Sequence, residues 1–392
     1  MRLNRQYRQN FARISAVSEK IQGRKSRLFV DTTGVFLNDL GTGIQRVARE
    51  VSAHLARLPS AYEVVRVYCD GVGYRECATG KEIVVCAGDI FFVLDQALAE
   101  LRRHRTYFAA LLAHGVKLAA FFHDLIPLKT PELCPREYPK DFRDFFGLVL
   151  QFPLIICNSA SVATELGDYL SAHPKIPRNP RLRITHALLG CDFTRFGTTR
   201  AFARGALAEE NNAVRFLMVS TVEPRKMYAQ AVRAFTLLWQ KGLNVQLWIV
   251  GRPGWRNEKT FQLIERSYEY GKRLLWYKDG ISDAELASLY ERSDAVLFAS
   301  CAEGFGLSVA EGAHFGKPLI LRDLPVFREL AGDNAFYFSG EDAETLAAAV
   351  EAWLSLYEAG AAPTSAGIAL PTWEACSRRI LALLTETDDG GV

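Results

Sequence analysis

The sequence predicts an α/β fold with two domains, each built on a parallel β-sheet. With 392 residues, the chain is too long for one compact core and suits two domains of ordinary size. Short apolar runs of strand length alternate with helical patterns in both halves, as is typical of parallel sheets covered on both faces. Glycine-containing loops follow several of these runs, where sheets of this type bind ligands.

The composition indicates a globular protein, with 49% hydrophobic and 23% charged residues. No apolar run approaches the ~18 residues that would span a bilayer, and the basic N-terminus does not resemble a secretory signal. The eight cysteines are scattered, which favours reduced thiols in a cytoplasmic protein over disulfides or a zinc site. A net charge of +3 is too small to indicate a nucleic-acid partner.

Positive charge is concentrated in an N-terminal arm, residues 1–26. Eight Lys or Arg residues occur between Met1 and Arg27 against one acid, Glu19, and apolar residues recur close to helical spacing. Such a basic amphipathic helix can lie on an anionic membrane, which would make the protein peripheral on the inner face of the plasma membrane. A solvated arm, or a helix packed on its own protein, is the alternative.

The first domain is expected over residues 27–200, with a helix over 43–55. Its strands are expected at Arg27–Thr33, Glu63–Tyr68, Asp89–Leu94, Lys117–Phe122, Leu154–Asn158 and Arg183–Leu188. The irregular, aromatic stretch Leu128–Phe146 is interpreted as a loop that contacts an acceptor or a membrane, or else ties two elements together.

A polar segment, Thr198–Asn212, marks the domain boundary, and the second domain is expected over residues 201–370. Its strands are expected at Arg215–Ser220, Val245–Val250, Leu274–Tyr277, Ala295–Ala299 and Pro318–Leu321. Helices are expected to end at Trp239, to span Glu285–Glu291 after the capping residue Ser282, and to span Leu307–Phe315 and Pro371–Thr385.

The stretch from Leu297 to Arg322 combines a strand, a glycine loop, a helix and a second strand. Gly304 and Gly306 allow a tight turn and close approach of a ligand. Glu303 and Glu311 frame this turn with seven residues between them. Carboxylates repel phosphates but accept hydrogen bonds from hydroxyls, so the pair indicates a sugar or ribose ligand. The alternative is two solvated charges without a ligand.

The residues Glu303, Gly304, Phe305, Gly306 and Glu311 resemble the E-x7-E signature of the retaining glycosyltransferases of family 4. This resemblance implies the GT-B fold, in which two Rossmann-like domains face each other across a cleft. The second domain would bind a nucleotide-sugar donor and the first an acceptor. The last helix, within residues 371–387, would cross back to the first domain.

The same resemblance implies roles for the residues of the second domain. Glu303 would hold hydroxyls of the donor sugar and Glu311 the ribose, while the backbone around Ile281 would meet the base. The turn that contacts the donor would comprise Gly304, Phe305, Gly306 and Leu307.

Arg225 and Lys226 follow an expected strand and can neutralise a diphosphate. The chain has no D-x-D element suited to Mg²⁺, so we expect no metal and no other cofactor, and fixed cations must stabilise the departing diphosphate. The resembled family usually places an Arg five or six residues before this Lys. Here those positions hold Thr221 and Ser220, so Arg225 would have to substitute.

In the first half, Gly41 and Gly43 open a helix, but the third glycine of a dinucleotide-binding loop is missing, which disfavours an NAD-dependent dehydrogenase. In the resembled family this loop reaches the donor diphosphate, and Gly43 matches it. His123 follows an expected strand within HDLIP, a phrase similar to the acceptor-domain motif of polysaccharide mannosyltransferases, where the His lies beside the donor sugar. A structural histidine is the alternative.

Together these features predict a retaining, metal-independent glycosyltransferase with Glu303, His123 and Lys226 as catalytic residues. GDP-mannose is the first candidate donor and a dTDP- or UDP-sugar the next, with a lipid-linked bacterial surface glycan as acceptor. A nucleotide-sugar 2-epimerase on the same scaffold is one alternative. A catalytically degenerate scaffold that only binds a partner is the other.

Overall fold

The computed structural model describes residues 8–12, 24–39, 41–192 and 212–386. Most of the basic arm, and the expected boundary up to residue 211, lie outside these described residues. The chain divides into two compact units. The first comprises residues 1–128, 137–190 and 371–392, and the second comprises residues 129–136 and 191–370.

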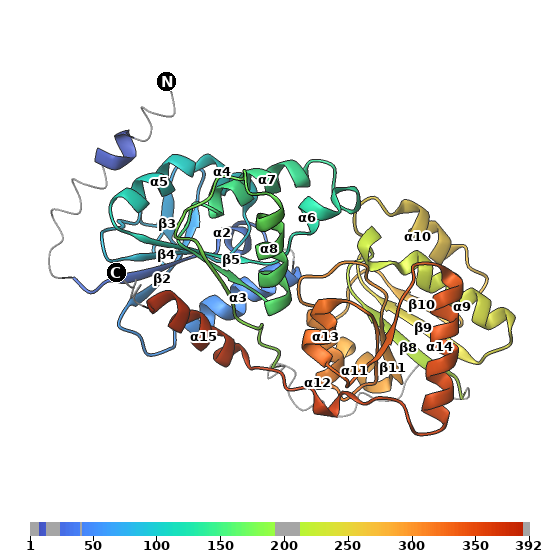
Figure 1. Ribbon diagram of the computed structural model, residues 1–392. Coiled ribbons are helices and arrows are strands. Elements are labelled where there is room, and N and C mark those ends of the chain that lie inside the picture. The colour runs from blue at the N-terminus through green and yellow to red at the C-terminus, as the bar shows by residue number, and fades with distance from the viewer. Residues whose placement is uncertain (1–7, 13–23, 40, 193–211, 387–392) are drawn as a thin grey trace. The chain divides into compact units, whose positions relative to one another are not determined.

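The first unit is built on a seven-stranded sheet with the strand order β3-β2-β1-β4-β5-β6-β7 (Figure 1). All neighbouring strands are parallel except β2 and β3. The strands are β1 (Arg27–Asp31), β2 (Glu63–Cys69), β3 (Tyr74–Glu76), β4 (Ile90–Val93), β5 (Lys117–Phe122), β6 (Leu154–Cys157) and β7 (Arg183–His186). The six strands expected from the sequence are confirmed, and the short β3 was not expected.

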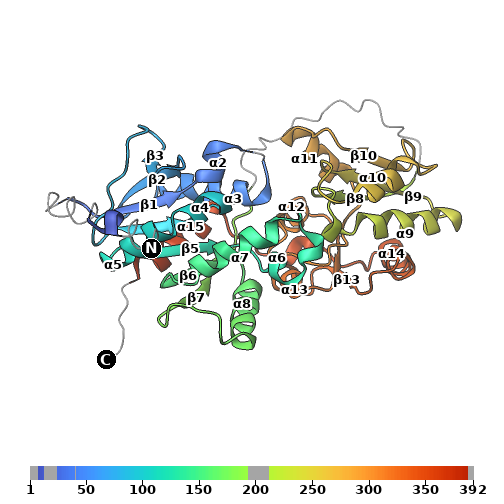
Figure 2. The same cartoon turned by 90° about the horizontal axis from the view of Figure 1, so that it is seen from above.

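Helices cover both faces of this sheet (Figures 1 and 2). Alternate strand residues such as Phe91, Val93 and Phe122 pack in one core cluster with the apolar stripes of α4, α5, α7 and α8. The opposite face carries α3 and α15, which contact each other. The helices are α2 (Thr33–Leu37), α3 (Gly43–Leu55), α4 (Leu98–Arg103), α5 (Arg105–Ala113), α6 (Ile126–Lys129), α7 (Tyr138–Val149), α8 (Ala160–Ala172) and α15 (Trp373–Thr385).

The second unit has a six-stranded, fully parallel sheet with the order β10-β9-β8-β11-β12-β13. Its strands are β8 (Val214–Val219), β9 (Val245–Val250), β10 (Leu274–Tyr277), β11 (Ala295–Phe298), β12 (Leu319–Arg322) and β13 (Phe336–Phe338). Its helices are α9 (Tyr228–Gln240), α10 (Glu258–Glu265), α11 (Asp283–Arg292), α12 (Leu307–His314), α13 (Pro325–Ala331) and α14 (Ala343–Glu358), with 3-10 turns η1 (Pro131–Leu133), η2 (Pro224–Lys226) and η3 (Ser365–Gly367).

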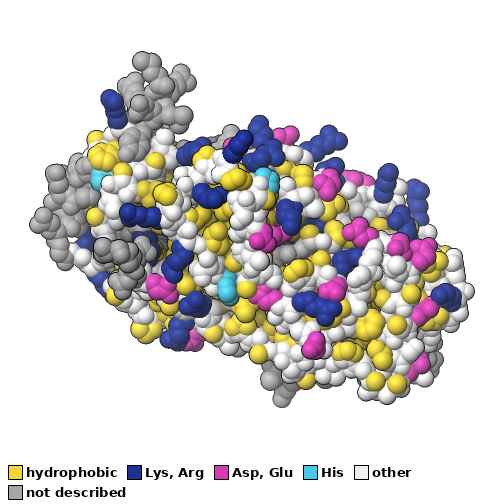
Figure 3. All heavy atoms as spheres, in the orientation of Figure 1, with side chains coloured by type: hydrophobic (Ala, Val, Ile, Leu, Met, Phe, Trp, Pro, Cys, Tyr) yellow, Lys and Arg dark blue, Asp and Glu magenta, His cyan; other side chains and the backbone are white. Residues whose placement is uncertain are grey.

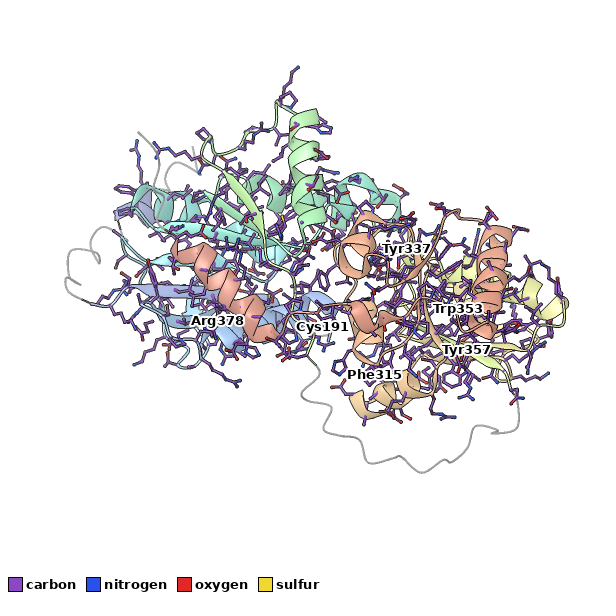
Figure 4. All side chains as sticks on the ribbon, turned by 60° about the horizontal axis from the view of Figure 1, so that its bottom comes forward. Cys191, Phe315, Tyr337, Trp353, Tyr357 and Arg378 are labelled. Carbon is purple, nitrogen blue, oxygen red and sulfur yellow. The ribbon has the colours of Figure 1, made fainter. Side chains whose placement is uncertain are left out.

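Two apolar clusters form the core of the second unit, one on each face of its sheet. Helices α9 and α14 pack together on one face, where the rings of Trp353 and Tyr357 stack with centroids 4.8 Å apart (Figure 4). Helices α11, α12 and α13 contribute Tyr290, Val309 and Phe327 to the cluster on the other face. The expected α/β class with two parallel sheets is therefore confirmed.

The aromatic stretch Leu128–Phe146 is not the single irregular loop expected from its prolines. Its second half forms most of α7, whose phenylalanines 142, 145 and 146 are buried in the core of the first unit. Residues 129–136 instead belong to the second unit. There Trp255 Nε1 donates to the carbonyl of Leu133 at 3.0 Å, and Arg256 Nη1 donates to that of Cys134 at 3.0 Å.

On the face drawn in Figure 3, basic and acidic side chains are interspersed, in keeping with a net charge of +3. Within the described ranges, no helix has both the length and the apolar character needed to cross a membrane.

The C-terminal helix α15 docks on the first unit through a very close backbone approach. A Cβ atom at Gly190 would lie 2.3 Å from the backbone N and Cα of Trp373, so only glycine fits there. Thr372 then caps α15 by accepting a hydrogen bond from the amide of Ala375 at 3.1 Å. The buried side chains of Trp373 and Ile380 complete the docking.

We predict that Gly190→Ala destabilises the first unit by about 2–3 kcal/mol, because the added methyl group must displace backbone atoms of α15. Amide hydrogen exchange in α15 should accelerate in the same variant. Gly167→Ala is the matched control: Gly167 lies within α8, and a Cβ there meets no atom within 4 Å. Helix propensity should make that variant about 0.5–1 kcal/mol more stable. Equal unfolding midpoints for the two variants would contradict this account of the docking.

Candidate functional site

The loop after β8 carries two cations on a tight 3-10 turn. Pro224 begins η2 with its φ angle fixed, and Met227 ends the turn in the left-handed region with φ 56° before α9 starts. The loop after β9 closes against it, because a Cβ at Gly251 would lie only 1.8 Å from the carbonyl oxygen of Ser220. Arg225 and Lys226 are therefore held at the carboxyl end of a central strand.

Glu303, on the loop after the neighbouring strand β11, lies directly against both cations. Arg225 Nη1 donates to Glu303 Oε2 at 2.8 Å, and Lys226 Nζ donates to Glu303 Oε1. Arg225 Nη1 also donates to the carbonyl of Ala302 at 3.1 Å, which ties the two loops together. The side chain of Glu303 is only 7% exposed, so this is a buried ionic cluster.

A second carboxylate, Glu223, completes the cluster. Its Oε1 lies 2.5 Å from Arg225 Nε, and its side chain is 3% exposed. Sequence reasoning missed Glu223 as a site residue, although it stands in the same E-P-R-K phrase as the cations. An acid in the loop after a buried strand, two residues before the first of two bases, was the available signal.

Burial and ion pairing shift the pKa values of this cluster in opposite directions. Burial raises the pKa of Glu303, but the positive charges of Arg225 and Lys226 outweigh it and hold that pKa below the ordinary value of 4.5. Burial, together with the charge of Arg225, lowers the pKa of Lys226, while Glu303 counteracts this. Because Lys226 donates directly to a carboxylate whose pKa is lowered, we treat the pair as ionised at neutral pH. Burial also raises the pKa of Glu223.

The glycine turn between Glu303 and Glu311 has the geometry that its sequence requires. Gly306 is the residue before α12 and has φ 95°, and a Cβ there would meet the ring of Phe327 at 2.8 Å. Phe305 is buried, and α12 begins at Leu307.

Glu311 is not a solvated helix residue. It is 5% exposed and accepts a hydrogen bond from the hydroxyl of Tyr290 at 2.8 Å. Nearby in sequence to Tyr290, Ile281 is half-buried directly before Ser282, which caps α11 in a reciprocal pair with Glu285. The second unit thus contains the acidic and basic residues predicted for the donor and brings Glu303, Arg225 and Lys226 into direct contact.

The two remaining predicted site residues belong to the first unit. His123 follows β5, is 4% exposed, and burial lowers its pKa to about 4, so its ring is uncharged at neutral pH. Gly43 is the first residue of α3, which is capped by Thr42 and Gln45 in a capping box. Within the described parts of the chain, no three His, Cys, Asp or Glu side chains gather as ligands of a metal ion would.

We predict that Glu303→Gln lowers the stability of the second unit by about 3 kcal/mol at neutral pH, because it leaves Lys226 without its carboxylate and Arg225 with Glu223 alone. A carboxyl group with a lowered pKa stabilises the fold above its unfolded pKa, here 4.5, and this contribution is lost as the pH falls. The difference between wild type and variant should therefore shrink below about pH 4.5.

Denaturant unfolding followed by tryptophan fluorescence measures this effect, because five of the six tryptophans lie in the second unit: Trp239, Trp248, Trp255, Trp276 and Trp353. Glu265→Gln is the matched control, since Glu265 pairs with Lys278 in a half-exposed ion pair at 2.7 Å. That variant should cost less than about 1 kcal/mol. A pH-independent difference for Glu303→Gln would refute the ionic account.

Comparisons with known proteins show what the chain is similar to. Residues 199–368 match the family model described as "Glycosyl transferases group 1". The serotype-specific mannosyltransferase WbdA of Escherichia coli is 34% identical over 375 residues, which cover 91% of this chain and 44% of that protein. The chain thus spans less than half the length of these relatives. O-antigen chain mannosyltransferase B of Escherichia coli is 26% identical over 275 residues, covering 66% of this chain and 68% of the relative.

Two solved structures share the fold at low sequence identity. Sucrose-phosphate synthase from Thermosynechococcus elongatus superposes with a TM-score of 0.63 at 16% identity, covering 91% of this chain and 98% of that one. The Anabaena protein HepE, solved in complex with UDP and glucose, gives 0.56 at 16% identity, with 92% and 95% covered. Residues 199–368 therefore match glycosyltransferase group 1, and the chain as a whole has the GT-B fold and resembles the O-antigen mannosyltransferases.

Proposed function

We propose that the chain is a retaining, metal-independent glycosyltransferase of family 4. GDP-mannose is the first candidate donor, on the similarity to mannosyltransferases. The proposed acceptor is a growing, lipid-linked surface glycan, reached at the inner face of the plasma membrane. The observation that carries the proposal is the buried contact of Glu303 with Lys226 and Arg225, on loops that follow the adjacent strands β8 and β11.

This cluster can serve sugar and diphosphate at once. The ammonium group of Lys226 has three N–H donors, and among the described residues the side chain that accepts a hydrogen bond from it is Glu303. Its other donors, together with the guanidinium of Arg225, suit phosphate oxygens. Each carboxylate has about four acceptor sites, so Glu303 can accept from sugar hydroxyls while it keeps both ion pairs.

In the proposed reaction, the bond between the anomeric carbon and the diphosphate oxygen breaks, and negative charge develops on the leaving group. Lys226 and Arg225 stabilise that charge through fixed, preorganised donors. The acceptor hydroxyl then bonds to the anomeric carbon on the same face, and its proton passes to the leaving phosphate oxygen. Glu311 would hold the ribose, in exchange with or beside its bond from Tyr290, and His123 would contact the transferred sugar.

The donor is identified by thermal unfolding with GDP, UDP and dTDP. A ligand that binds only the folded chain at 100 times its Kd stabilises it by about 2.7 kcal/mol. We expect GDP to raise the melting temperature most. Incubation with donor alone separates transfer from epimerisation, because an epimerase converts the sugar nucleotide without an acceptor.

We predict that Lys226→Ala and Glu303→Ala each lower sugar transfer at least about 100-fold, because each removes a charge that acts on the donor. Lys241→Ala, which removes a surface ion pair with Glu351, should leave transfer unchanged and serves as the control. EDTA should have no effect on the wild type. Circular dichroism verifies that each variant folds. If a variant fails to fold, transfer is measured with Glu303→Gln instead. Strict dependence on added Mg²⁺, or full activity of both variants, would overturn the proposal.

A further inference from the structure

Three neighbouring strands of the first sheet end in uncharged polar side chains. Strands β4, β5 and β6 are adjacent and parallel, so their carboxyl ends share one edge. Gln96 follows β4, His123 follows β5 and Asn158 follows β6. The backbone N–H of Asn158 donates to the carbonyl of Phe122 at 3.1 Å, which continues the β5–β6 pairing by one residue.

The strand register aligns two of these side chains. Phe122 pairs with Cys157, so His123 and Asn158 are the next pair. Residues paired in register point to the same face of a parallel sheet. Gln96 lies in the loop that leaves the same edge, three residues beyond Val93, the last residue of β4. The edge therefore presents an imidazole and an amide as a pair, with a second amide in the loop after the neighbouring strand.

Each of the three side chains has a buried atom without a hydrogen-bond partner among the described residues. These atoms are Gln96 Nε2, His123 Nε2 and Asn158 Oδ1. His123 is 4% exposed and Asn158 is 3% exposed. Buried polar atoms are nearly always paired, and each unpaired one costs stability. Three such atoms at the ends of adjacent strands make this edge a candidate for a polar ligand.

The hydrogen-bonding groups at this edge indicate which class of ligand it would bind. The neighbouring acids are engaged with backbone amides: Asp95 accepts from the N–H of Val35 in α2 at 2.7 Å, and Asp124 accepts from that of Ile126 at 3.0 Å. An amide nitrogen donates, an amide oxygen accepts, and a neutral imidazole nitrogen does one or the other. Hydroxyl groups both donate and accept and so match this set, whereas a phosphate would need cations.

We propose that Gln96 and Asn158, together with His123, bind hydroxyl groups of a pyranose at the carboxyl edge of the first sheet. This inference rests on the proposed function and extends it from His123 to two residues that the sequence did not single out. The hydroxyls belong either to the transferred sugar of the donor or to the terminal sugar of the acceptor, and both present the same chemistry.

The test uses the full chain with near-isosteric apolar replacements, Asn158→Leu and Gln96→Met. Each should lower kcat/KM for sugar transfer about 10- to 100-fold, the effect of losing one buried hydrogen bond to substrate. The melting temperature should not fall, because an unpaired buried polar atom has been removed. Thermal stabilisation by GDP alone should be unchanged. Ser377→Ala is the control: its Oγ is also buried and unpartnered among the described residues, but on α15, and transfer should be unaffected.

Deoxy substrates distinguish the two sources of the hydroxyl. If the edge binds the donor sugar, the wild type should transfer more slowly from one monodeoxy donor than from the complete donor. Asn158→Leu should transfer equally well from both. If the acceptor is bound, a monodeoxy acceptor shows this pattern instead. Either result supports the inference. A wild type that transfers sugar while both variants keep full kcat/KM would overturn the inference alone, and a wild type that transfers from no sugar nucleotide would overturn the proposed function with it.

Discussion

The contact of Glu303 with Lys226 and Arg225 is the interaction on which the second unit's site depends. Buried charges are costly unless they are paired and hydrogen-bonded. Here two carboxylates and two cations balance one another, with Glu223 holding Arg225 from the other side. The cluster therefore holds two partly buried cations at a sheet edge through ion pairs within the protein. A diphosphate would meet donors already oriented, which is the condition for electrostatic preorganisation.

Sheet topology explains why residues 77 positions apart make this contact. Strands β8 and β11 are neighbours in the sheet although β9 and β10 lie between them in sequence, because the strand order reverses at β8. Ligands of open α/β sheets bind where such a reversal leaves a crevice outside the carboxyl ends of the strands. The η2 turn follows β8 and the loop of Glu303 follows β11, so both contribute to that position.

Much of this arrangement could be predicted from local patterns. Strands β5, β9 and β10 have the bounds expected from their apolar runs, and α3 spans the predicted residues. The three-residue strands β3 and β13 are too short to give a periodic signal. The stretch around Pro131, Pro135 and Pro139 misled the analysis, because Pro139 lies in the first turn of α7, where proline is tolerated. The pairing of Glu223 with Arg225 depends on burial, which sequence spacing does not reveal.

The two sheet edges differ in kind, and under the proposed function each edge suits a different chemical group. The edge of the second sheet holds ionised groups that suit a diphosphate. At the edge of the first sheet, Gln96, His123 and Asn158 are uncharged, and each has one buried atom without a partner among the described residues. An uncharged edge offers no cation to attract a phosphate. It discriminates instead through unsatisfied donors and acceptors, because a sugar that lacks the matching hydroxyl leaves a buried polar atom unpaired. Charge thus suits the leaving group, and neutral hydrogen bonding suits the choice of sugar.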